Sequence, residues 1–164
     1  RLPSGAVVHF LCSHPTPPAF DGPEQRNKRR NYDEIRFWGD YLSQRGYIVD
    51  DLANEGGLER GEHFVIMGDL NADPVDPGWE ENPMRDELLS HPRLGPDPKP
   101  TSDIAIEGLD PRDTATWGKR VDYVLPSRTL RVVRTGIWRP EAQDVGSCPS
   151  DHFPVWAEID VPSP

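Results

Sequence analysis

Residues that can bind a metal ion or transfer a proton lie at the ends of four apolar stretches of this chain. They are His14, Asp69, Asn71, Asp122, Asp151 and His152. Carboxylates hold a hard cation, an imidazole moves a proton or binds developing negative charge, and an amide orients a nucleophile. This combination of side chains suits a metal-assisted attack on phosphate.

Asp69 and Asn71 are two residues apart, directly after the apolar segment 63–67. If the backbone stays extended, both side chains point to the same side and share one small space. The alternative is a turn, because Asn and Asp are common turn residues. The spacing with Asp73 resembles a calcium loop, but Pro74 and Val75 follow where that loop needs other residues, so we reject this interpretation.

Asp122 stands at the start of an apolar run, where a carboxylate becomes half-buried and needs a partner. A histidine would be a suitable partner. Asp151 and His152 are adjacent, so a regular strand would turn them to opposite faces. At the first residues of a strand both can reach a pocket at the rim of a sheet, although a merely polar strand start is also common.

His14 follows the first apolar stretch, where a lone histidine is more often structural than catalytic. A donor-rich cluster lies further along the chain. The members proposed to bind substrate are Arg26, Asn27, Arg30 and Asn31. Guanidinium groups match phosphate oxygens, and a helix N-terminus adds amide donors. These residues could therefore clamp a phosphate, or they could form a solvated helix start.

Apolar periodicity predicts strands at residues 6–12, 63–67, 121–125, 130–138 and 153–161. Helical spacing predicts a helix over residues 31–44, with Asn31 and Glu34 as a capping box and Gly46 after its end. A short helix is expected over residues 83–90, and residues 91–119 form the longest irregular stretch. The second half steps from strand to strand, which favours α+β layering.

The length of 164 residues fits one domain, and the composition, 35% hydrophobic and 28% charged, is that of a polar globular protein. The net charge of −10 disfavours a duplex-binding surface and favours a small phosphorylated substrate or a bridging cation. Cys12 and Cys148 could form a disulfide or remain free thiols. No long apolar run is present, so we expect a soluble protein. The arginine-rich basic set indicates a bacterial parent, with secretion and compartment left open.

Three motifs carry a family resemblance. Gly-Asp-Leu-Asn at 68–71, Asp-Tyr-Val-Leu at 122–125 and Ser-Asp-His at 150–152 resemble the C-terminal signature of the endonuclease/exonuclease/phosphatase superfamily, which has the DNase-I-like fold. The resemblance extends over residues 9–161. It implies a four-layer α/β sandwich of mainly antiparallel sheets flanked by helices, with residues 1–164 as the C-terminal part of a single domain. The N-terminal half, with its Asn and metal-binding Glu, would then be missing.

The resemblance also implies roles. Asp69 would orient or deprotonate water and bind metal, with Asn71 steadying it and Asp151 as a further ligand. His152, held by Asp122, would contact the phosphate, and His14 would bind it or protonate the leaving oxygen. Trp117 would be an aromatic neighbour.

We therefore predict a phosphoesterase that depends on Mg²⁺ or Mn²⁺, with Ca²⁺ as an alternative, acting on a mono- or diester of unspecified identity. The alternative is a non-catalytic fragment or phosphate-binding module of the same fold. In either case we expect the missing N-terminal half as a partner, or self-association.

Overall fold

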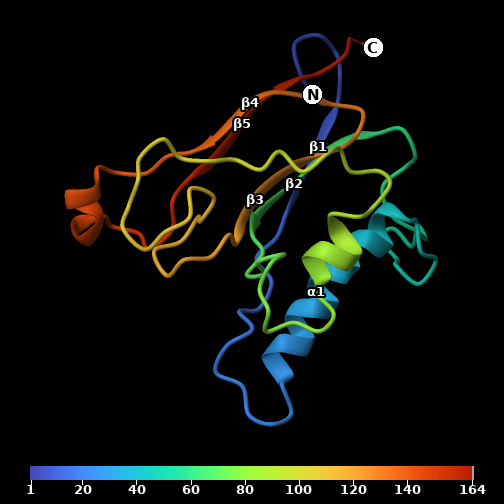
Figure 1. Cartoon of the computed structure of the whole chain (residues 1–164). Helices are drawn as coiled ribbons and strands as arrows, with labels where there is room; N and C mark the ends of the chain where they lie inside the picture. The colour runs from blue at the N-terminus through green and yellow to red at the C-terminus, as the bar shows by residue number, and fades with distance from the viewer. Residues whose placement is uncertain (164) are drawn as a thin grey trace.

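The computed structural model describes residues 1–163 (Figure 1). Across these residues the order of elements is β1 (Val8–Cys12), α1 (Arg26–Leu42), β2 (His63–Asp69), the π-helical turn η1 (Met84–Leu88), β3 (Asp122–Pro126), β4 (Arg131–Ile137), the 3₁₀ turn η2 (Ala142–Ser147) and β5 (Val155–Asp160). The predicted strands and the short helix thus exist, with ends shifted by a few residues. No regular element of more than a few residues forms between η1 and β3, as expected for residues 91–119.

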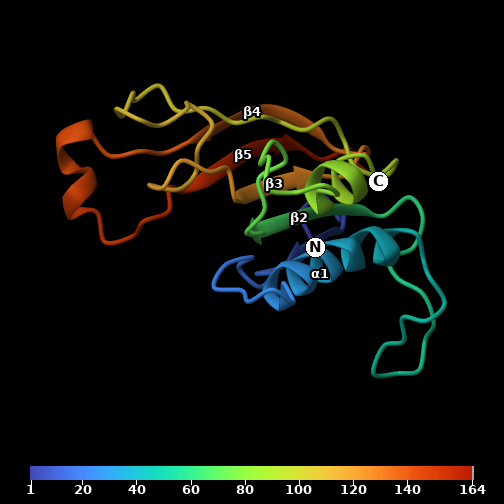
Figure 2. The ribbon, with the colours of Figure 1, turned by 60° about the horizontal axis from the view of Figure 1, so that its bottom comes forward.

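The strands form two small sheets in a mixed α/β arrangement. β1 pairs with β2 in parallel, and β2 pairs with β3 in antiparallel orientation. The parallel step needs a crossover, which α1 provides. β4 and β5 form an antiparallel pair, and β5 lies beside β3, so that the strands follow one another in Figure 2.

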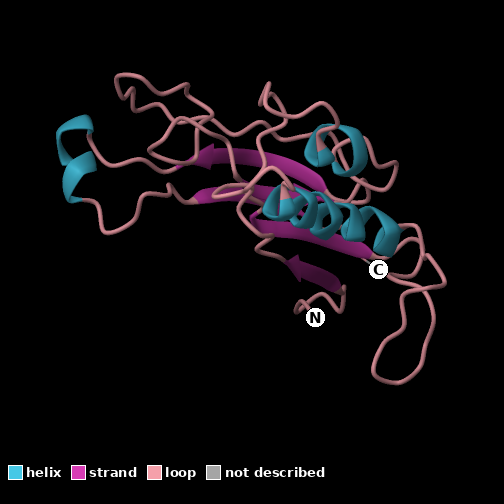
Figure 3. Cartoon of the chain, turned by 90° about the horizontal axis from the view of Figure 1, so that it is seen from below, coloured by secondary structure: helices cyan, strands magenta, loops and turns pink. Residues whose placement is uncertain are grey.

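One face of the three-stranded sheet is covered by α1 and η1. Ile35 and Leu42 of α1 are fully buried and belong to one core cluster with Phe64, Ile66 and Leu125 of the sheet. Each of these β2 and β3 side chains points to the helix side because side chains alternate along a strand. Figure 3 shows α1 running along the strands, with η2 at a distance from it.

The opposite face of this sheet is apolar and open. Met67 and Val124 are paired across β2 and β3 and alternate with the helix-facing Ile66 and Leu125. Phe10 of β1 lies on this same face and is 66% exposed. Apolar strands such as β1 and β2 are typical of a sheet covered on both faces, and α1 covers only one of them here.

The predicted start of α1 was wrong. The helix begins at Arg26, because the carboxylate of Asp21 accepts hydrogen bonds from the amides of Asn27 and Lys28, at 2.7 and 2.8 Å. A side chain that lies outside the helix thus satisfies its free amides. Asn31 is therefore buried inside the helix and forms no capping box, and the helix ends at Leu42, before Gly46.

Over residues 1–163, no helix has the length and apolar character needed to cross a membrane. Cys12 and Cys148 are both free thiols.

Candidate active site

The ends of β1 and β2 and the start of β3 meet at one edge of the sheet. His14 lies two residues beyond β1, and Asp69 is the last residue of β2. Asp69 is directly opposite Asp122, the first residue of β3. Like charges opposite one another on neighbouring strands repel, so this register needs a compensating cation.

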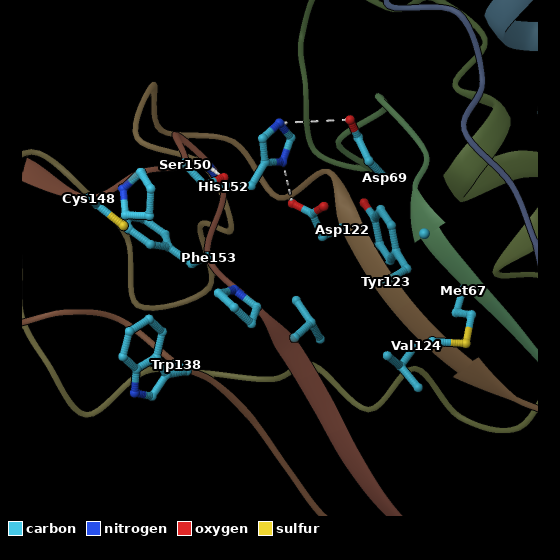
Figure 4. Close-up of a pocket in the computed structure, with 14 residues that line it drawn as sticks. Met67, Asp69, Asp122, Tyr123, Val124, Trp138, Cys148, Ser150, His152 and Phe153 are labelled. Carbon is cyan, nitrogen blue, oxygen red and sulfur yellow. Dashed lines mark hydrogen bonds and ion pairs between the residues drawn. The ribbon is translucent and has the colours of Figure 1, made fainter.

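His152 lies between these two carboxylates (Figure 4). Its Nδ1 is 2.9 Å from Oδ2 of Asp122, and its Nε2 is 3.8 Å from Oδ2 of Asp69. The pairing expected for the half-buried Asp122 is therefore present. The contact with Asp122 fixes the orientation of the imidazole and leaves Nε2 facing Asp69.

Burial and charge shift both members of the pair. Burial by itself lowers the pKa of His152, but the hydrogen bond to Asp122 and the charges of Asp122, Asp69 and Asp151 raise it by more. Burial raises the pKa of Asp122, and the hydrogen bonds from His152 and Thr114 offset only part of this rise. An imidazole between two partly buried carboxylates thus keeps its proton to a higher pH than a free histidine.

Asp69 also contacts His14 and Asn71. Nε2 of His14 is 3.3 Å from Oδ2 of Asp69, and the His14 side chain is 71% exposed. Asn71 has a left-handed backbone (φ 52°), which allows its amide N–H and its Nδ2 to donate to the two oxygens of Asp69, at 2.9 and 3.1 Å. Nδ2 of Asn71 also donates a hydrogen bond to the Pro15 carbonyl, at 3.1 Å. Oδ1 of Asn71 is the atom then left to meet a metal ion or a phosphate.

Thr114 is a site residue that no sequence pattern predicted. It is fully buried, and its Oγ1 accepts the amide hydrogens of Val121 and Asp122, at 2.9 and 3.0 Å. Its carbonyl accepts the amide of Phe153 at 2.7 Å. Thr114 therefore ties the start of β3 to the His152 segment, but it stands in the irregular stretch 91–119, where no periodicity marks it.

Trp117, from the same stretch, lies against His152 in an edge-to-face arrangement, with ring centroids 5.0 Å apart. It is still 49% exposed. The aromatic neighbour that the resemblance implied is thus present beside the imidazole.

A cavity of about 440 Å³ opens beside this cluster and continues along the open sheet face. Asp69, Asp122 and His152 line its polar end, and Met67, Val124 and Trp138 line its apolar part (Figure 4). The three polar residues each offer one ligand atom, and these atoms lie within 4.8 Å of one another. The carboxylate oxygens fit Mg²⁺ or Mn²⁺ by donor type, whereas the imidazole of His152, bound to Asp122, is better suited to contact a phosphate oxygen.

Other predicted site residues lie outside this ligand group. Asp151 is exposed, and its charge contributes to the raised pKa of His152. Asn27 donates Nδ2 to the Ala19 carbonyl at 2.8 Å, and Arg30 lies 3.4 Å from Glu34. Arg26 is exposed on the first turn of α1. The structure describes no contact of Arg26, Asn27 or Arg30 with the residues around Asp69, so their substrate role stays a prediction.

Asn31 differs from the other members of this cluster. It is fully buried, and its Nδ2 donates to the carbonyls of Thr16 and Leu70, both at 3.0 Å. A side chain without exposed surface cannot clamp a substrate phosphate, so that prediction was wrong for Asn31. Its contacts are with the backbone of the loops that carry His14 and Asp69.

Sequence comparison identifies the family. The profile of the Endonuclease/Exonuclease/phosphatase family matches residues 4–152. The chain belongs to this family. Members of the Endonuclease/Exonuclease/phosphatase family are mostly hydrolytic enzymes that use divalent metals, in keeping with the carboxylate and imidazole groups at the sheet edge. No curated protein matched the chain.

Two solved structures resemble this member of the Endonuclease/Exonuclease/phosphatase family. A structure of beta toxin 275-280 from Staphylococcus aureus is 14% identical, with a TM-score of 0.51, and the match covers 92% of this chain and 52% of that one. A functionally unknown conserved protein from Enterococcus faecalis V583 is 17% identical, with a TM-score of 0.48 and coverage of 82% and 45%. The first likeness supports a shared fold. The chain spans about half the length of each structure.

Proposed function

We propose that the chain is part of a divalent-metal-dependent phosphoesterase that hydrolyses a phosphate ester with activated water. The observation that carries this proposal is the position of Asp69. Its carboxylate is contacted by His14 on one side and faces His152 on the other, while Asp122 holds His152 from behind. A base, two imidazoles and hard oxygen ligands thus surround one small space, as hydrolysis of a phosphate ester requires.

Each residue has a role in this reaction. Asp69 accepts a proton from water, whose oxygen forms a bond to phosphorus while the bond to the leaving oxygen breaks. His14 delivers a proton to that leaving oxygen, for which its high exposure leaves room. His152, kept protonated by Asp122, donates from Nε2 to a non-bridging phosphate oxygen. Mg²⁺ or Mn²⁺, held by Asp69, Asn71 and Asp151, would supply Lewis-acid stabilisation of the phosphate charge.

The chain is, in this proposal, the C-terminal part of a single domain, and the rest of the domain covers the open sheet face in a four-layer sandwich. Two observations support this arrangement. The match covers 52% of the beta toxin structure, and the face that carries Phe10 and Met67 is apolar, with Phe10 66% exposed. The covering half would also supply the Asn and Glu that complete the metal site.

A non-catalytic phosphate-binding module is the second candidate. The exposed position of Asp151, outside the ligand group of Asp69, Asp122 and His152, favours it for the isolated chain. The two candidates differ in turnover, because binding alone releases no product.

Hydrolysis of bis-p-nitrophenyl phosphate, with Mn²⁺ or with EDTA, separates them. We expect little activity from the chain alone and metal-stimulated release of nitrophenol when the other half of the domain is added. Loss of a metal ligand costs roughly a thousandfold in rate or more, which sets the expected difference between the two samples. An Asp69→Asn variant of the assembled protein should be inactive. Full activity from the chain alone would overturn the division of the site between two halves. No metal-stimulated activity in the assembled protein would favour the binding module.

A further inference from the structure

The loops that carry His14 and Asp69 are both attached to one side of α1. Asn31 contacts three carbonyl oxygens through Nδ2, those of Thr16 at 3.0 Å, Leu70 at 3.0 Å and Asn71 at 3.4 Å. Thr16 is two residues beyond His14, and Leu70 directly follows Asp69. One buried amide therefore bridges both catalytic loops.

Glu34 lies one helical turn after Asn31 and binds the same loop. Its carboxylate accepts the amide of Thr16 at 2.5 Å and the Thr16 hydroxyl at 3.1 Å. The backbone N–H and C=O of Thr16 are thus both bound to α1, one by Glu34 and one by Asn31. This leaves the loop after His14 little freedom to move relative to the helix.

The two loops are also bound to each other. Asn71 donates Nδ2 to the carbonyl of Pro15 at 3.1 Å and to Oδ2 of Asp69 at 3.1 Å. Its left-handed backbone is a conformation that Asn tolerates better than most residues. The contacts of α1 therefore hold this loop in the position where the Asn71 side chain reaches both Pro15 and Asp69.

Asn31 occupies a position where an apolar residue would contribute more to the stability of the fold. It lies in the interior of a helix, next to the core residue Ile35, and has no exposed surface. An apolar side chain would suit that environment better, since a buried amide contributes only if its hydrogen bonds are made. The bonds that Asn31 makes all lead to the two catalytic loops.

We propose that Asn31 and Glu34 are positioning residues, which set the 3.3 Å separation of His14 Nε2 and Asp69 Oδ2 through the backbone of the two loops. The inference rests on the proposed function, because it assigns a catalytic use to that separation. Helix α1 would then have two roles. Its polar side chains bind the backbone of the two loops, and its apolar side chains pack in the core.

Amide hydrogen exchange, followed by NMR on the 164-residue chain, tests the contacts directly. Glu34→Ala removes the acceptor of the Thr16 amide, which should then exchange roughly five- to tenfold faster, the change expected when an ordinary hydrogen bond is lost. Asn31→Ala removes the donor to the carbonyls of Thr16, Leu70 and Asn71, so the amides of Thr16 and Asn71 should exchange faster because both loops open more often. Glu34→Gln should restore slow exchange at Thr16, because its amide can accept from the N–H and donate to the hydroxyl. Wild-type exchange in both alanine variants would overturn the proposal.

Asn82→Ala is the matched control. Asn82 is also a fully buried asparagine, but its Nδ2 donates to the Asp73 carbonyl at 2.7 Å, further along the loop that follows Asp69, and not to the segment after His14. This variant should lose stability without faster exchange at Thr16. Equal acceleration in Asn82→Ala would show a general loosening and overturn the specific role. If Asn31→Ala does not fold, Glu34→Ala, at a partly exposed position, decides the question.

Mn²⁺ affinity adds a functional measurement on the same samples. Calorimetry should show weaker binding in Asn31→Ala and Glu34→Ala, and wild-type affinity in Glu34→Gln and Asn82→Ala. Wild-type affinity in both alanine variants, despite faster exchange, would overturn the positioning role. If the wild-type chain takes up no Mn²⁺, the metal assignment fails under the proposed function, and the exchange rates alone decide the role of the Asn31–Glu34 pair.

Discussion

Asp122 and His152 form the most tightly coupled pair of the site. Burial lowers the pKa of His152, and the hydrogen bond and charge of Asp122 are the main causes that raise it, so removing the charge should lower the pKa. We expect Asp122→Asn to lower the pKa of His152, measured by NMR titration of its ring protons in metal-free buffer. An unchanged or higher value would show that the two side chains do not interact in solution.

The same pair makes stability depend on pH. The folded-state pKa of His152 lies above its unfolded value of about 6.5, so its stabilising contribution is complete below that pH and is lost as the pH rises through the folded-state pKa. The melting temperature of the wild type should therefore fall relative to that of Asp122→Asn as the pH rises from about 6.5 through the folded-state pKa of His152. Parallel melting curves for the two proteins would contradict this linkage.

Metal binding tests the oxygen ligands separately. Asp69 and Asp151 are the proposed hard ligands, and because the proposal assigns further ligands to the covering half, the affinity of the isolated chain should be weak. Calorimetric titration with Mn²⁺ should give smaller heats for Asp69→Asn and Asp151→Ala than for the wild type. Asp51→Ala removes one exposed charge from a different loop and serves as the control. Equal heats for Asp151→Ala and the wild type would remove Asp151 from the ligand set.

At the scale of the elements, Gly68 determines how closely β1 and β2 approach at the site. It has a φ of 141°, and a Cβ at this position would overlap the carbonyl oxygen of Ser13. Gly68→Ala should push the end of β1, and His14 with it, away from Asp69. We expect a stability loss of about 1–3 kcal/mol, the usual cost of overpacking, in urea denaturation.

Gly146→Ala provides the comparison for that variant. Gly146 lies in η2, and a Cβ there meets no atom within 4 Å. Its unfolding midpoint should therefore equal that of the wild type. A Gly68→Ala protein as stable as Gly146→Ala would show that the strands can separate without cost.

At the scale of the whole molecule, the charge of −10 opposes binding to duplex DNA. The basic residues between Arg26 and Arg36 form a patch too small to follow a duplex, and Arg30 and Arg36 are paired with neighbouring carboxylates. Small phosphate esters should compete better for the site than DNA of equal phosphate content. Tight, salt-sensitive DNA binding in a mobility-shift assay would contradict this expectation.

The open sheet face should determine how the chain assembles. Phe10 lies on the edge strand β1 with 66% of its surface exposed, and Phe20, 101% exposed, lies on the loop between β1 and α1. Phe10→Lys should weaken binding of the covering half about tenfold or more, as expected when an apolar interface side chain becomes charged. Phe20→Lys should leave it unchanged. Equal effects of both changes in analytical ultracentrifugation, or self-association unaffected by Phe10→Lys, would place the interface elsewhere.

Local patterns sufficed for much of the fold and the family. The apolar runs at residues 63–67 and 121–125 indicated β2 and β3 because the alternation and β-branched content of a strand lie within a few neighbouring residues. The motifs around Asp69, Asp122 and His152 identified the family for the same reason, since each is a short contiguous segment. The half-buried setting of Asp122 even indicated a histidine partner.

Only the tertiary structure decided which side chains meet. Asp21 moved the start of α1, and with it turned Asn31 from an expected cap into a buried link between two loops. Thr114 lies in a stretch without apolar periodicity, yet its hydroxyl accepts the amide of Asp122 in the site. These outcomes depend on hydrogen bonds between segments that are distant in sequence. The satisfaction of buried polar groups is settled when the whole chain packs, and no local pattern encodes it.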